Sequence, residues 1–99
     1  MRIDENGRRL SIKESLLIDL QYEIDNVNFS DNIEETKSYY FITTKMEEWT
    51  EYDDKSLSEE QLNLLINYLQ ESTQSLQDCY FEIMEMVESG DYSRAEKIV

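Results

Sequence analysis

The chain has 99 residues, one cysteine, no proline and no histidine, and its formal net charge is −14. This length predicts one small domain over residues 1–99, and a single cysteine excludes an internal disulfide framework. The negative charge argues against direct binding to nucleic acid or to an anionic membrane, because both would repel the protein. It favours a basic protein partner instead.

The sequence also lacks the signals of a membrane protein. No apolar run approaches the ~20 residues of a membrane-spanning helix, and the first residues lack the apolar core of a signal peptide. One cysteine is also in keeping with a reducing compartment. We therefore expect a cytoplasmic protein.

Residues 1–10 contain Asn6 followed by Gly7, the pair most typical of a two-residue hairpin turn. Pairing across this turn would set Ile3 opposite Leu10 and two acidic residues opposite two arginines. An isolated hairpin is marginal in water. The segment is therefore predicted to be either a β-hairpin that leans on the helices or an N-terminal arm.

A first helix is predicted over residues 11–28. Ser11 and Glu14 form a capping box at its start. A stripe at spacings of four and three gives it one apolar face, made by Ile12, Leu16, Leu20, Ile24 and Val27. The other side carries Glu14, Asp19, Glu23 and Asp25.

A second helix is predicted over residues 31–52, and Asp31 with Glu34 repeats the capping pattern. Its inner face would be formed by Tyr39, Ile42, Met46 and Trp49. Residues 39–44 are nevertheless rich in strand-favouring side chains. The alternative is therefore an α+β fold, in which this segment pairs with the N-terminal hairpin in a small three-stranded sheet.

Residues 58–89 are predicted to form one long helix. Ser58 and Gln61 mark its start as a capping box, and Gly90 marks its end because glycine accepts the left-handed conformation. The helix would be roughly 48 Å long. Alternating steps of four and three define its packing seam, which comprises Leu62, Ile66, Leu69, Thr73, Leu76, Tyr80, Ile83 and Val87.

Short loops between these segments predict an all-α, antiparallel three-helix bundle. The first two helices would measure ~27 Å and ~33 Å, so the long helix would extend beyond them. Its overhanging end carries Phe81, Met84 and Met86. A short helix over residues 92–98 could fold back over this end, or a second copy of the chain could cover it in a homodimer.

The residue types argue against catalysis. Without histidine the chain lacks the commonest general base and the commonest zinc ligand, and it has no glycine-rich phosphate loop. Cys79 lies next to the seam and reads as a small buried hydrophobic residue. We therefore expect no enzyme activity, no metal and no cofactor.

Among the aromatic residues, Trp49 is predicted to lie in the core, whereas Tyr40 and Tyr52 are candidates for an interface.

The acidic surface carries the functional argument, because two long stretches, residues 14–36 and 56–93, contain no Lys or Arg. The outer face of the long helix contributes Glu71, Asp78, Glu82, Glu85 and Glu88. The end of the second helix and the loop into the third contribute Glu47, Glu48, Glu51, Asp53 and Asp54. Uncompensated carboxylates one turn apart cost roughly a few tenths of a kcal/mol per pair. Such a surface serves either solubility alone or binding to the basic groove of a nucleic-acid-binding protein.

In its small size, its acidity and its lack of catalytic residues, the sequence resembles phage-encoded inhibitors of bacterial defence, such as anti-CRISPR and anti-restriction proteins, some of which mimic DNA. The resemblance is one of type, and it carries no residues over. It implies a non-enzymatic inhibitor that binds a basic nucleic-acid-binding enzyme or effector. The alternative is a helical interaction module, such as an immunity protein, a small chaperone or an adaptor, that binds through Phe81, Met84 and Met86.

Overall fold

The computed structural model describes residues 10–52 and 56–97, and these ranges contain five helices and no strand. In chain order the helices are α1 (Ile12–Asn26), α2 (Asn32–Trp49), α3 (Glu59–Glu71), α4 (Leu76–Ser89) and α5 (Ser93–Glu96). The all-α prediction is therefore confirmed. The predicted hairpin lies outside the described residues, except for Leu10, which is buried.

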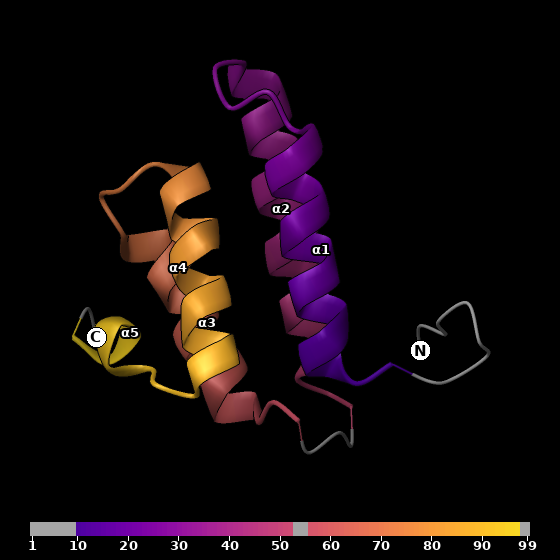
Figure 1. The fold of residues 1–99 in the computed structure, drawn as a ribbon, viewed down its shortest axis with the longest axis vertical. Helices are drawn as coiled ribbons and strands as arrows, with labels where there is room; N and C mark the ends of the chain where they lie inside the picture. Colours follow the sequence, from indigo (N-terminus) through magenta and orange to yellow (C-terminus); the bar gives the residue numbers. More distant parts are fainter. Residues whose placement is uncertain (1–9, 53–55, 98–99) are drawn as a thin grey trace.

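The first four helices form two antiparallel hairpins that lie side by side, with both hairpin turns toward the same end (Figure 1). Contacts join α1 to α2, α2 to α3, α3 to α4 and α4 back to α1. The short helix α5 packs against α3. The result is a four-helix arrangement with a small fifth helix, and the predicted three-helix bundle is wrong in the number of its long elements.

Local sequence signals set most of the helix boundaries. Ser11 and Ser58 each form the expected capping box at the start of α1 and α3. The side chain of Asp31 accepts hydrogen bonds from two backbone N–H groups in the first turn of α2. Gly90 ends α4 with φ 79° and ψ 6°, which is the left-handed conformation predicted for it.

The helix predicted over residues 31–52 is confirmed, and the alternative of a strand at residues 39–44 is wrong, because this segment lies in the middle of α2. The apolar side chains that this segment buries at helical spacing outweigh its strand-favouring composition. Ile42 and Met46 stand one turn apart and are completely buried, and Thr43 satisfies its hydroxyl by donating to the carbonyl of Tyr39 at 2.9 Å. Tertiary packing overrides intrinsic propensity here.

The predicted long helix over residues 58–89 is also wrong, because it is two helices separated at Ser72–Ser75. Ser72 has extended backbone (φ −67°, ψ 141°), and its hydroxyl accepts a bond from the N–H of Gln74 at 3.2 Å. Ser75 then caps α4 by accepting from the N–H of Asp78 at 3.2 Å. Serine and threonine compete with the helix for backbone hydrogen bonds, and a run of them makes this turn.

The predicted seam nevertheless identifies the core, apart from Thr73, which is exposed in the turn. Its remaining positions face inward because both helices of the α3–α4 hairpin pack on the same interior. All five helices contribute side chains with no exposed surface to this core. They include Leu16, Leu20, Ile42, Met46, Leu62, Leu65, Tyr80, Ile83 and Ala95.

Folding residues 59–89 into a hairpin removes the predicted overhang. Met86 is only 3 % exposed and belongs to the core, and Met84 is partly buried against it. Phe81 remains 48 % exposed on the outer side of α4. The short terminal helix covers α3 near its start rather than the far end of a long helix. The structural reason for expecting a homodimer is therefore gone.

On α1, two acids expected on the outer side are buried. Asp19 is 4 % exposed and Glu23 is 9 % exposed. The helix contacts α2 along one side and α4 along the other, so the buried arc is wider than a single apolar stripe. The prediction that Asp19 and Glu23 face solvent is therefore wrong.

Candidate binding surface

The predicted acidic residues are spread over several helices. Glu71 is exposed at the end of α3, and Glu47, Glu48 and Glu51 are exposed at the end of α2 and just beyond it. Asp53 and Asp54 lie outside the described residues. The helix α4 holds the other four, Asp78, Glu82, Glu85 and Glu88, which we call the α4 acidic face.

The α4 acidic face is compensated at its centre. Glu82 is only partly exposed, and the phenol of Tyr68 on α3 donates a hydrogen bond to its carboxylate. From α5, the Arg94 guanidinium lies 3.2 Å from a carboxylate oxygen of Glu85 and 3.8 Å from one of Glu82. The prediction of an uncompensated stripe is therefore wrong, because folding brings in a cation that is distant in sequence.

Asp78 and Glu88 remain exposed at the two ends of the α4 acidic face. Neither forms an ion pair with another residue in the described part of the chain. Phe81 lies between them, one turn from each neighbouring acid, and is half-exposed. This part of α4 thus presents separated carboxylates around an aromatic ring.

The predicted apolar interface is not a single patch. Met86 is buried, Phe81 is on α4, Tyr40 is on α2, and Tyr52 follows α2. Tyr40 and Tyr52 are exposed as predicted. Trp49 is partly buried and packs against the core, which agrees with its expected role.

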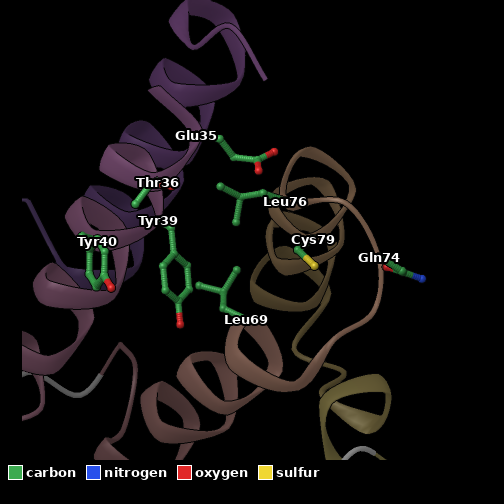
Figure 2. A pocket seen from close by; sticks show the side chains of 8 residues that line it. All are labelled: Glu35, Thr36, Tyr39, Tyr40, Leu69, Gln74, Leu76 and Cys79. Carbon is green, nitrogen blue, oxygen red and sulfur yellow. The ribbon is translucent and has the colours of Figure 1, made fainter. Parts of the chain in front are cut away.

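A groove opens where the first half of α2 faces the turn between α3 and α4, and its volume is about 400 Å³. We call it the Tyr39 groove, and Figure 2 shows its lining from these three elements. It is lined by Glu35, Thr36, Tyr39, Tyr40, Leu69, Gln74, Leu76 and Cys79.

The ring of Tyr39 occupies the middle of the groove, beside Leu69 (Figure 2). Tyr40 meets it edge-on, with ring centroids 5.4 Å apart and planes at 63°. The carboxylate of Glu35 points from α2 toward Leu76 on α4, while the amide of Gln74 points away from the groove (Figure 2). The groove therefore combines an aromatic and aliphatic floor with an anionic edge.

The surroundings of the Tyr39 phenol are electrostatically negative. Burial raises the pKa of Tyr39 above its usual value, and the nearby Tyr40, Glu47 and Glu71 raise it further. Glu47 on α2 and Glu71 on α3, which belong to the two predicted acidic regions, thus both raise the pKa of Tyr39. The two lysines of α2, Lys37 and Lys45, do not line the groove.

Cys79 forms part of the inner wall of the Tyr39 groove and is buried, which confirms the interpretation of this residue as a small core side chain. Burial raises the pKa of its thiol, and a hydrogen bond with Ser72 lowers it by a smaller amount. A buried thiol with a raised pKa is a poor nucleophile. The groove therefore offers binding groups rather than an activated nucleophile.

Sequence reasoning missed the groove as a site. Glu35 and Tyr39 are one helical turn apart, which places them on one face of α2. Nothing local, however, indicates that Leu69 and Leu76 lie opposite them, because that depends on the break at Ser72–Ser75. Within the described ranges no group of three or more side chains is arranged to hold a metal ion, and none of the helices has the length and apolar character of a membrane span.

Comparison of the chain with known protein families, with curated proteins and with solved structures finds no match. The functional argument therefore depends on the surface chemistry described above.

Proposed function

We propose that this protein is a non-enzymatic acidic inhibitor that binds the basic groove of a nucleic-acid-binding protein in the cytoplasm, in the manner of DNA-mimicking anti-CRISPR or anti-restriction proteins. The observation that carries the proposal is the charge of the α3–α4 hairpin. Residues 59–89 contain seven carboxylates and no Lys or Arg. Six of the seven are exposed, and Arg94 compensates only the centre of the α4 acidic face.

Long-range attraction explains why such a distribution suits this role. A surface of one sign raises the rate of encounter with a surface of the opposite sign, and the effect weakens as salt screens the charges. Like charges one helical turn apart repel each other, whereas opposite charges stabilise a helix. A hairpin that carries carboxylates and no cation therefore lacks this stabilisation. Binding to a basic groove would compensate for the repulsion.

The first test is capture with the immobilised chain from a bacterial lysate at low and at high salt, followed by identification of the bound proteins. The proposal expects a nucleic-acid-binding protein that is retained at low salt and is released at high salt or by added nucleic acid. Capture of partners that withstand high salt and do not bind nucleic acid would contradict it.

The second test is charge reversal at the exposed ends of the α4 acidic face. The variant Asp78→Lys with Glu88→Lys avoids Glu82, whose contacts with Tyr68 and Arg94 belong to the fold. We expect this variant to lose affinity for the captured partner at least about tenfold, since close interfacial charge pairs contribute about 1.5 kcal/mol or more.

A matched control reverses the same number of charges elsewhere, with Asp25→Lys on α1 and Glu96→Lys on α5, both of which are exposed. Circular dichroism should show unchanged helicity in both proteins. Equal loss of affinity in the control would mean that net charge alone matters and that the α4 acidic face is not the binding surface.

A helical interaction module is the second candidate, favoured by the exposure of Phe81. Burial of Met86 removes one of the three side chains on which that interpretation relied. The two functions separate experimentally. Binding through Phe81 should persist in high salt and be lost on Phe81→Ala, whereas binding through carboxylates should show the opposite pattern.

A further inference from the structure

The Tyr39 groove contains the chemical groups that recognise a cation on an aliphatic stem. Tyr39 and Tyr40 supply aromatic faces, Leu69 and Leu76 supply an apolar wall, and Glu35 supplies a carboxylate at the edge. Each group comes from a regular helix, so the set is held by the packing of α2 against the α3–α4 hairpin.

We propose that the Tyr39 groove receives an arginine side chain presented by the basic partner. This inference rests on the proposed function, and it adds a specific contact to an otherwise diffuse electrostatic surface. A planar guanidinium stacks on aromatic rings and pairs with a carboxylate in a fixed geometry. Its aliphatic stem packs on leucine, as long cationic side chains do on apolar surfaces.

The size and charge of the groove fit this occupant. A volume of about 400 Å³ lies within the range of small-ligand pockets, about 300–1,000 Å³, and leaves room for one long side chain. A neutral apolar group could fill the same space. It would gain nothing from Glu35, nor from the negative surroundings that Glu47 and Glu71 create at Tyr39. Charge complementarity therefore favours arginine.

The test uses the full chain labelled with ¹⁵N and a single-residue probe, N-acetyl-arginine amide, in about 0.15 M salt, where diffuse attraction is screened beyond ~8 Å. The neutral isostere N-acetyl-citrulline amide is the matched probe. Saturable shifts should be concentrated at Glu35, Thr36, Tyr39, Tyr40, Leu69 and Leu76, and citrulline should bind at least about threefold more weakly.

Two variants examine the groove itself. We expect Tyr39→Leu and Glu35→Gln each to weaken arginine binding by about two- to tenfold, in line with cation–π and exposed ion-pair contributions. Glu96→Gln makes the same charge change at an exposed position of α5, outside both the groove and the α4 acidic face, and should leave binding within about twofold. If Tyr39→Leu unfolds the chain, Glu35→Gln and the citrulline comparison still decide the question.

Equal binding of citrulline and arginine would overturn the proposal, because the groove would then be a simple apolar pocket. Shifts that follow the α4 acidic face and disappear with Glu88→Gln would overturn it as well. Both readouts use the isolated protein and need no partner. A groove that fails to bind arginine is thus distinguishable from a failure of the proposed function, which would appear as a captured partner that does not bind nucleic acid.

Discussion

The hydroxyl of Ser38 on α2 and the phenol of Tyr80 on α4 lie 2.8 Å apart in the buried core. The two helices are diagonal neighbours in the bundle, because α2 packs on α1 and α3 while α4 packs on the same two. Phe29 meets the Tyr80 ring edge-on, with centroids 6.0 Å apart. This hydrogen bond joins the two helical hairpins across the interior and satisfies both hydroxyl groups where water is excluded.

Replacing Ser38 should lower the unfolding free energy by more than the small size of its side chain suggests. Ser38→Ala leaves the Tyr80 phenol buried without its partner, and such a group costs about 1–3 kcal/mol of unfolding free energy. Urea denaturation followed by circular dichroism at 222 nm measures this. The double variant Ser38→Ala with Tyr80→Phe should be more stable than the sum of the two single losses implies. Strict additivity would mean that the bond does not couple the two hairpins.

Stability should fall in alkaline solution because of Tyr80. Burial raises its pKa above the ordinary value of 10.0, and the Ser38 bond offsets only part of this. Above about pH 10 the unfolded chain releases the phenolic proton while the folded chain retains it, so unfolding is favoured as pH rises. The protonated Tyr80 phenol therefore makes its full contribution to the unfolding free energy below pH 10, and this contribution is lost as the pH rises above 10.

Tyr80→Phe should therefore show a shallower decline in unfolding free energy than the parent between about pH 10 and 11. Urea midpoints at several pH values, with pH 8 as the reference, give the comparison. Parallel curves for the two proteins would show that Tyr80 does not keep its proton in the folded state.

The break between α3 and α4 predicts an asymmetry between two neighbouring residues. Ser75→Ala removes the side chain that caps α4 and should lower the unfolding free energy by about 0.5–2 kcal/mol. Thr73→Ala, in the same turn but exposed, should change it by less than about 0.5 kcal/mol. In one continuous helix alanine would stabilise both positions, so a gain of stability in Ser75→Ala would contradict the break.

A side chain at Gly90 would have enough space, but the backbone conformation at this position is unfavourable for any residue except glycine. A Cβ atom built at this position meets nothing within 4 Å, yet φ is +79°. Gly90→Ala should therefore cost about 1–2 kcal/mol, and Gly90→Asn should cost less because asparagine accepts the left-handed region more readily. Thermal unfolding of both variants tests the order, and equal losses would point to a crowded site instead.

The sequence was informative where the cause of the structure is local. Capping residues located the starts of α1, α2 and α3, and Gly90 located the end of α4. The apolar spacing identified the buried seam on both sides of Ser72–Ser75, because the repeat acts within each helix, and the seven-residue step from Leu69 to Leu76 also happens to fit one continuous helix. That coincidence also concealed the break. Ser75 and Asp78 formed a capping signal inside the predicted helix.

The binding surface was less predictable, because its electrostatics depend on residues distant in the chain. The acids of α4 follow one another in sequence, but Arg94 and Tyr68, which engage Glu82, come from two other helices. In the same way, the Tyr39 groove exists only because α2 lies against the turn between α3 and α4.

The sequence by itself determined the helical class, the apolar seam that faces the core and the strong negative charge, since these follow from periodicity, capping and composition. Only the tertiary structure decided that residues 59–89 fold back on themselves, that Met86 enters the core, and that aromatic and acidic groups meet around Tyr39. The physical reason is that the apolar surface of a single long helix could not be covered by two shorter ones, whereas a hairpin buries its own surface. Closing that hairpin against α2 then forms the groove.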